Sequence, residues 1–427
     1  MRQFTNTRPL PVVAALAVAL LACERTPPRA IPGIPHAGFR TDIADSLRGN
    51  ATFESATITR DGRWLVTTHL NSPDLRAWDA HSGALVARIR AGVDQNEPWL
   101  VDGASQRLVA HRPGGAGLSV FDLRSGAFVG DVGDSAASPA APLGVAHRTL
   151  VVARAGAIET WSLDSLVRTS HVEVAALGAP PRCIGGMPFT YHDRHCWELS
   201  GDARWLAIAF TAGTAPDAPT RFVLVDLVAA TAEELALPDG APDRYIAAFA
   251  YSSDGARLAV GTDRGVWLRN IAAHAWGTRL EGRHARNPYL GALAFNSDDA
   301  RLVTLGDQLQ LSTFDVADGR LVGQANPPDW DKEGILRLST DGRRAVVYHF
   351  VADVLEVMDA TTMTHIGWVC PYFCNTKHNP VPVAFALSPD GRVLAASHRY
   401  GAALWDPAAD RVIAPLRDPT LPPLPPR

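Results

Sequence analysis

Lysine is almost absent from this 427-residue chain. Lys332 and Lys377 are the only two among 40 basic residues, and the other 38 (40 − 2) are arginines. Acidic residues number 44, so the formal net charge is −4 at pH 7, and no segment concentrates positive charge. Because affinity for nucleic acid comes largely from neutralising phosphates, this composition argues against a nucleic-acid-binding protein.

Motifs that mark common enzyme classes are also missing. The sequence contains no Gly-x-Ser-x-Gly elbow, no phosphate-binding Gly-Lys-Ser/Thr loop, no His-Glu-x-x-His motif and no EF-hand loop. We therefore predict no catalytic residue, no cofactor and no resident metal. A binding protein is favoured over an enzyme.

Cysteine is scarce, with five residues in the chain. None of them forms the Cys-x-x-Cys pair of redox motifs or of haem attachment. Cys183, Cys196, Cys370 and Cys374 fall in two insert-like segments, whereas Cys23 stands alone near the N-terminus.

The N-terminal segment has the pattern of an export signal. Arg2 and Arg8 precede the apolar run of residues 10–22, "LPVVAALAVALLA", which is too short to span a bilayer as a helix. The stretch 20–23, Leu-Leu-Ala-Cys, resembles a bacterial lipobox. That resemblance implies a lipoprotein signal peptide over 1–22, cleavage before Cys23, and acylation of Cys23 by palmitate-like chains that anchor the protein to a membrane. The alternative is an ordinary secretory signal in which Cys23 is incidental.

The residues after Cys23 predict the location more closely. Residues 23–52 contain a proline-rich stretch typical of an extended tether. Glu24 is not the aspartate that often marks inner-membrane retention. We expect the cell envelope, with the outer membrane, at its periplasmic face or surface, favoured over the inner membrane.

A hairpin phrase recurs along the chain. "ATITRDGRWLVTT" at 56–68 is closely similar to "FALSPDGRVLAAS" at 385–397, and each pairs two alternating apolar runs with an Asp-Gly turn, predicted as a tight two-residue turn. The commonest spacing between copies is 42–44 residues, the length of a four-stranded propeller blade. The apolar residues that open the second strand of each copy are Leu65, Leu108, Leu150, Leu206, Leu258, Leu302, Ala345 and Leu394.

A third run follows each hairpin and usually ends in an aspartate. These ends are Asp79, Asp122, Asp226, Asp315, Asp359 and Asp406, with Ser162 and Asn270 at the same place in units three and five. Four short strands repeated eight times predict an all-β, eight-bladed β-propeller over 53–416 with four antiparallel strands per blade. Seven blades is the alternative. The proline-rich tail, 417–427, is expected to be a loose extension.

This repeat pattern resembles the WD40-type β-propellers, and the hairpin phrase resembles the repeats of the periplasmic protein TolB. The Asp-x-x-Ser/Thr-Gly turns also resemble those of the eight-bladed lipoprotein of the outer-membrane barrel-assembly machinery. The chain lacks the Gly-His dipeptide of WD40 repeats, so the hydrogen-bond network of that family is not carried over to it.

Three insertions are expected on one face of the ring, because fourth-to-first and second-to-third connections emerge on the same side. They are residues 178–196, 211–221 and 367–382. In an oxidising compartment the four insert cysteines favour disulfides, and we predict Cys183–Cys196 and Cys370–Cys374. A metal or redox site with His192, His195 and Cys196 is the alternative.

The same face also receives the ends of the second strands. In ring order, units seven, eight, one, two and three place His349, His398, His69, Arg112 and Arg154 there, a basic or titratable arc suited to an acidic partner. Polar strand ends without a binding role are the simpler interpretation. The inserts add the aromatic residues Phe189, Tyr191, Tyr372 and Phe373, which are either interface anchors or packing beneath each insert's disulfide.

Together these features predict a membrane-anchored platform that binds another envelope protein, or an accessory subunit of an envelope complex. A small-molecule ligand is not indicated. The alternative is a lactonase-like or metal-dependent enzyme with a site at the channel mouth, where Asp329 and Asp331 would be candidate ligands.

Overall fold

The structure is a computed structural model, and it describes residues 53–69, 72–92, 99–112, 117–133, 140–177, 196–211, 220–238, 246–262, 265–280, 292–305, 310–325, 334–349, 354–369, 384–398, 401–409 and 411–420. Within these ranges the regular structure consists of 32 β-strands and no helix. The strands form eight sheets of four, and within each sheet the strands follow one another in chain order.

Each sheet is one blade, and the blades are numbered here along the chain. Blade one contains β1 (Ser55–Ile58), β2 (Trp64–His69), β3 (Ser72–Asp79) and β4 (Leu85–Ile89); blade two contains β5 (Trp99–Asp102), β6 (Arg107–His111), β7 (Leu118–Asp122) and β8 (Phe128–Val132). Blade three contains β9 (Ala141–Ala146), β10 (Thr149–Arg154), β11 (Ala157–Ser162) and β12 (Arg168–Glu173); blade four contains β13 (Trp197–Leu199), β14 (Trp205–Thr211), β15 (Thr220–Asp226) and β16 (Thr231–Glu234).

The second half of the chain repeats this plan. Blade five contains β17 (Ile246–Tyr251), β18 (Arg257–Thr262), β19 (Gly265–Asn270) and β20 (Ala275–Leu280); blade six contains β21 (Ala292–Phe295), β22 (Arg301–Leu305), β23 (Leu311–Asp315) and β24 (Leu321–Ala325). Blade seven contains β25 (Gly334–Leu338), β26 (Arg344–His349), β27 (Val354–Asp359) and β28 (Thr364–Val369); blade eight contains β29 (Phe385–Leu387), β30 (Leu394–His398), β31 (Gly401–Asp406) and β32 (Arg411–Leu416).

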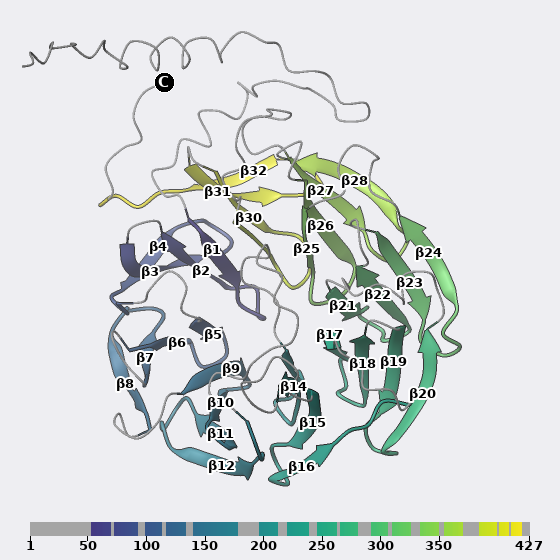
Figure 1. The fold of residues 1–427 in the computed structure, drawn as a ribbon. Helices are drawn as coiled ribbons and strands as arrows, with labels where there is room; N and C mark the ends of the chain where they lie inside the picture. Colours follow the sequence, from purple (N-terminus) through teal and green to yellow (C-terminus); the bar gives the residue numbers. More distant parts are fainter. Residues whose placement is uncertain are drawn as a thin grey trace, which may run out of the picture.

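The blades form a closed ring, as Figure 1 shows. The first strands of most neighbouring blades contact one another, and β1 of blade one contacts β29 of blade eight. The fourth strands, such as β8, β12, β20 and β28, lie at the periphery. The prediction of an eight-bladed, all-β propeller is confirmed.

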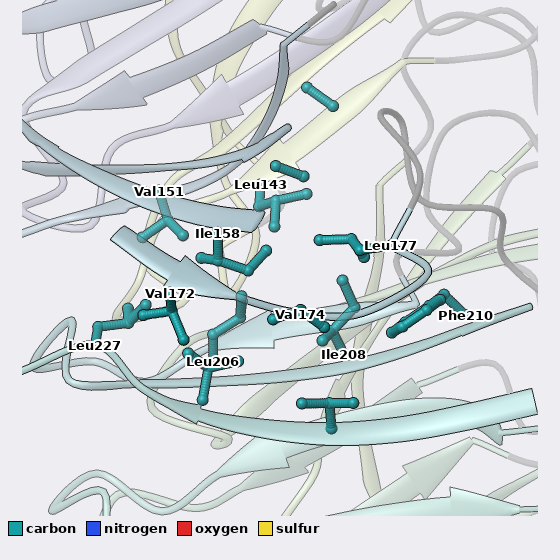
Figure 2. Close-up of a cluster of buried hydrophobic side chains, with 14 residues drawn as sticks. Leu143, Val151, Ile158, Val172, Val174, Leu177, Leu206, Ile208, Phe210 and Leu227 are labelled. Atoms are coloured by element: carbon teal, nitrogen blue, oxygen red, sulfur yellow. The ribbon is translucent and has the colours of Figure 1, made fainter. Parts of the chain in front are cut away.

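Hydrophobic side chains between the blades hold the ring together. Each of eight buried clusters joins two neighbouring blades, and the last joins blade eight to blade one. Figure 2 shows one of them, in which Leu143 and Val151 of blade three pack with Leu206 and Ile208 of blade four. A twisted four-stranded sheet has two apolar faces, and radial packing buries both.

The residues that opened the second strand of each repeat form the centre of this packing. All eight are completely buried, with 0% exposure: Leu65, Leu108, Leu150, Leu206, Leu258, Leu302, Ala345 and Leu394. The repeat unit was therefore placed correctly from the sequence in every blade.

The turn between the first two strands differs from the predicted two-residue turn. In blade one, Ile58 pairs with Leu65 and the Thr59 amide bonds to the Trp64 carbonyl at 2.8 Å, which leaves a four-residue loop over 60–63. Only Gly62 has a positive φ, at 70°. The longer loop results from the side chain of Thr59, which lies two residues before Asp61 of the Asp-Gly pair. Thr59 Oγ1 accepts the Trp64 amide at 3.0 Å and donates to Asp61.

This hydroxyl motif recurs in other blades. Ser200, Ser252, Ser339 and Ser388 each donate to an aspartate two residues later and accept an amide five residues later. Where glycine is replaced, the same backbone geometry persists, since Ala203 and Asp299 have φ values of 60° and 57°. The motif therefore fixes the loop even where the Asp-Gly signature has degenerated.

The aspartates that end the third strands stabilise the next turn. Asp79 Oδ1 accepts the amides of His81 at 3.1 Å and Ser82 at 2.8 Å, and Asp122 repeats this geometry in blade two. Burial opposes ionisation of Asp79, but these hydrogen bonds outweigh it and hold the pKa of this carboxyl below its usual value.

The expectation of a loose tail over 417–427 is wrong for the residues that the structure describes. Asp418 is completely buried and forms ion pairs with Arg76 and Arg88 of blade one. The carboxylate of Asp418 lies between the two guanidinium groups and holds residues 417–420 in place. The proline-rich composition alone predicts a loose segment. Residues 421–427 lie outside the described part of the chain.

Candidate functional site

The predicted arc lies at the ends of the second strands. His69, Arg154, His349 and His398 are the last residues of β2, β10, β26 and β30, and Arg112 directly follows β6. The side chain of His398 lies outside the described part of the structure.

The two described histidines of the arc are buried inside their blades. His69 is 3% exposed, and its Nε2 is 2.8 Å from Thr67 Oγ1, which also accepts the indole N–H of Trp78 at 2.9 Å. His349 is 0% exposed, and its Nε2 is 2.9 Å from Glu356 Oε2. Neither ring reaches the surface, so a docking role for these two histidines does not fit their positions.

The two arginines of the arc pair with carboxylates of their own blades. Arg112 pairs with Asp131 of β8, and Arg154 Nε donates to Glu159 Oε2 of β11 at 2.8 Å. Their side chains remain 30% and 14% exposed. Among the four arc residues whose side chains the structure describes, Arg112 therefore keeps the most surface for a partner.

Most of the predicted insert residues lie outside the described ranges. These are Cys183, Phe189, Tyr191, His192, His195, Cys370, Tyr372, Phe373 and Cys374, together with Cys23 and the loop acids Asp329 and Asp331. Cys196 is described; it is 6% exposed and engaged in an interaction. The two disulfides and the metal alternative at 192–196 stay predictions.

A feature that sequence reasoning missed lies on the outer rim. In blades one, two, six and eight the fourth strand contains one unpaired extra residue, a β-bulge, at Val86, Val129, Val322 and Ile413. These side chains are between 39% and 46% exposed. A bulge on an edge strand discourages pairing with another sheet, and here it also turns an apolar side chain outward.

Blades one to three carry a larger set of exposed apolar residues on this rim. Phe128 is 58% exposed and Val167 is 59% exposed, and they join Val86 and Val129. The rims of these blades are close to one another: a Cβ added at Gly130 of β8 would lie 2.6 Å from Leu166, in the turn before β12, and one added at Gly126 of blade two would lie 2.2 Å from the carbonyl of Arg88 on β4. We call Val86, Phe128, Val129 and Val167 the rim patch.

A cavity of about 720 Å³ lies between blades four and five. Its walls include the turn residues Asp202, Asp226 and Asp254, together with Trp205 and Ile271. The carboxylates are internally engaged: Asp226 pairs with Arg204 at 3.1 Å, and Asp202 and Asp254 accept the serine hydroxyls of their own turns. The cavity therefore has polar walls whose described charges already have partners.

Two further groups occupy the centre of the ring. Arg60 of blade one donates from Nη1 to the carbonyl of Gly201 in blade four at 3.2 Å, and so bridges blades that are not neighbours. Glu198 lies on β13, an innermost strand. Glu198 is an exposed residue, but the protein that surrounds it desolvates its carboxyl and raises the pKa of Glu198 to about 7.

Across the described ranges, no group of three or more His, Cys, Asp or Glu side chains is placed to hold a metal ion. Within those ranges there is also no helix with the length and apolar character of a membrane span.

Comparison with known proteins identifies the fold alone. No family model and no curated protein matches the chain. Among solved structures, the crystal structure of the computationally designed Ika8 protein is similar, with a TM-score of 0.57 and 14% sequence identity over 84% of this chain and 98% of that one. At this identity the likeness supports the propeller architecture and carries no information on function.

Proposed function

We propose that this chain is a lipid-anchored protein of the bacterial cell envelope whose propeller binds another protein and performs no chemistry of its own. The observation that carries the binding role is the rim patch. Phe128, Val86, Val129 and Val167 are exposed on three neighbouring blades, and clustered exposed apolar side chains are typical of protein-binding surfaces.

The ring suits such a role because it is rigid. Eight apolar clusters close it, so a partner meets a surface that loses little conformational entropy on association. The predicted inserts would add the aromatic anchors Phe189, Tyr191, Tyr372 and Phe373 on one face. The buried, engaged sulfur of Cys196 supports the proposed Cys183–Cys196 disulfide.

Anchoring is proposed through Cys23, at the outer membrane. The tether over 23–52 would leave the ring free to orient toward a partner. Intact-mass measurement and detergent partitioning of the wild type and a Cys23→Ser variant test this part. Acylated wild type and a soluble variant support the anchor, whereas an unmodified, soluble wild type contradicts it.

The binding role is tested by crosslinking and co-purification of the anchored protein. The comparison uses the wild type, a Phe128→Ser/Val129→Ser rim variant, and a variant lacking 184–195 and 371–373. Val228→Ser is the control, because Val228 is 75% exposed on blade four and is not one of the rim-patch residues. A specific partner that is lost in the rim or insert variant, and kept in the control, supports the platform.

An enzymatic role is the second candidate, and one observation favours it. Glu198, with its pKa raised to about 7 inside the ring, is the kind of titratable group found at functional sites. If no partner is recovered and a metal or small molecule co-purifies with the wild type, the enzymatic function is favoured over the binding function.

A further inference from the structure

The chain beyond the last strand crosses from blade eight to blade one. Residues 417–420 follow β32, and in Figure 1 the yellow end of the ribbon extends over the purple blade. Asp418 Oδ2 accepts Arg76 Nε of β3 at 2.5 Å, and Arg88 Nη2 of β4 lies 2.5 Å from both carboxylate oxygens. Thr420 donates its amide at 3.0 Å and its hydroxyl at 2.8 Å to Asp418 Oδ1.

We call the boundary between two neighbouring blades a seam. The seam between blades eight and one, which this segment crosses, differs from the other seven. Every blade consists of four consecutive strands, so no sheet hydrogen bonds join one blade to the next. At seven seams the chain itself passes from a fourth strand to the next first strand, but blades eight and one have no such connection. Joining them costs loop-closure entropy, and non-covalent contacts alone must offset it.

Apolar packing supplies one part of these contacts. Leu65 and Trp78 of blade one pack with Leu404 and Leu416 of blade eight. The amide of Phe53, just before β1, also donates to Ser397 Oγ of β30 at 2.8 Å. The described start of the chain and the segment after β32 therefore meet at the same seam.

The ion pairs at Asp418 supply the other part. Burial alone would raise the pKa of the Asp418 carboxyl, but hydrogen bonds from Arg76, Thr420 and Arg88 outweigh it and hold the pKa far below its usual range. Arg76 is 3% exposed, and among the described residues Asp418 is the carboxylate with which it pairs. Removing Asp418 would leave this guanidinium buried without its counter-charge, which is strongly unfavourable.

We propose that residues 417–420 are a closure strap, in which Asp418 binds Arg76 and Arg88 and holds the ring shut at its one seam without a covalent connection. Opening of the ring begins at this seam and requires release of the strap. The strap acts on blades one and eight only and leaves the packing of blades four and five untouched.

Hydrogen exchange read by mass spectrometry tests the strap in the full-length protein. In Asp418→Ala, amides of β1–β3 and β29–β31 should exchange about 100-fold faster than in the wild type, the change expected when a buried ion pair loses one partner. Amides of β14 and β18 should be unchanged. The control is Asp164→Ala, which removes the exposed Arg148–Asp164 pair and should leave every blade unaffected.

Two measurements keep the test decisive if Asp418→Ala folds poorly. An Arg76→Leu/Asp418→Leu variant removes both charges and should recover most of the lost protection. In the wild type at low urea, amides of blades one and eight should open before those of blades four and five. Equal acceleration in all blades of Asp418→Ala, or opening of blades four and five first in the wild type, would overturn the strap.

Discussion

Arg154 and Glu159 form the centre of a charge network at the end of blade three. Arg154 Nε donates to Glu159 Oε2 at 2.8 Å, and the same carboxylate accepts Arg168 at 2.9 Å and the indole N–H of Trp161 at 3.1 Å. Glu159 is 3% exposed. Arg154, which by its place in the repeat was a candidate for binding a partner, is thus first a structural residue of its own blade.

Replacing Glu159 with glutamine should lower the free energy of unfolding by about 3 kcal/mol, because Arg154, Arg168 and Trp161 lose the buried negative charge to which they donate. Burial opposes ionisation, but the hydrogen bonds from Arg154, Arg168 and Trp161 outweigh it and lower the pKa of Glu159 from 4.5. A lowered carboxyl pKa stabilises the fold above the unfolded pKa and loses that effect as the pH falls through the folded pKa. The difference in Tm between wild type and Glu159→Gln should therefore be widest above about pH 5 and shrink below about pH 4.

The matched control for this prediction is Glu234→Gln. Glu234 pairs with Arg221, but its side chain is 54% exposed. An exposed pair contributes less than about 1 kcal/mol. Equal losses in the two variants, or a Tm difference for Glu159→Gln that does not change with pH, would contradict the network.

Glycine substitutions should separate backbone conformation from blade packing. Gly342 has a φ of +63°, and an added Cβ would lie 2.3 Å from the Phe295 carbonyl of the neighbouring blade. Gly156 has a φ of +79° with nothing within 4 Å of an added Cβ. Gly342→Ala should cost about 3 kcal/mol or more, and Gly156→Ala about 1 kcal/mol, measured by urea denaturation. A similar loss of unfolding free energy in both variants would show that the turn at Gly342 does not pack against blade six.

Glu198 should titrate far from an ordinary glutamate. Desolvation raises the pKa of its carboxyl from 4.5 to about 7, and Arg60 counteracts only part of this. Because the pKa is higher in the folded state, the protonated carboxyl favours folding. Its contribution to the free energy of unfolding is complete below the unfolded pKa near 4.5 and is lost as the pH rises through 7. Carboxyl-selective NMR should find a midpoint near 7 that disappears in Glu198→Gln. A midpoint near 4.5 would show that the carboxyl stays fully hydrated.

The repeat could be predicted from the sequence because it depends on short-range patterns. Leu206 and Leu302 lie in blades with degenerate turns, Asp202-Ala203 and Asp298-Asp299, yet both were placed correctly by the alternation of apolar residues. The backbone explains this, since Ala203 and Asp299 adopt the positive φ that glycine adopts elsewhere.

Burial of polar residues could not be predicted in the same way. His69 stands at a strand end that the repeat assigns to the surface, but Thr67 and Trp78 enclose it. The partner of Asp418 is 342 residues away along the chain, and no local pattern predicts Arg76 as that partner. The bulge at Val86 shifts the register of β4 by one residue. β4 has only five residues, and the alternation of so short a sequence does not predict the shift.

The proposed binding role is tested most directly by photocrosslinking in intact cells. A photoreactive amino acid would be placed at position 128, on the rim patch, and at position 228 as the control in the anchored protein. The platform predicts a discrete crosslinked species from position 128 that is absent at position 228 and is lost when Val129 is also replaced by serine. The absence of any crosslinked species at position 128, or an identical pattern at both positions, would contradict it.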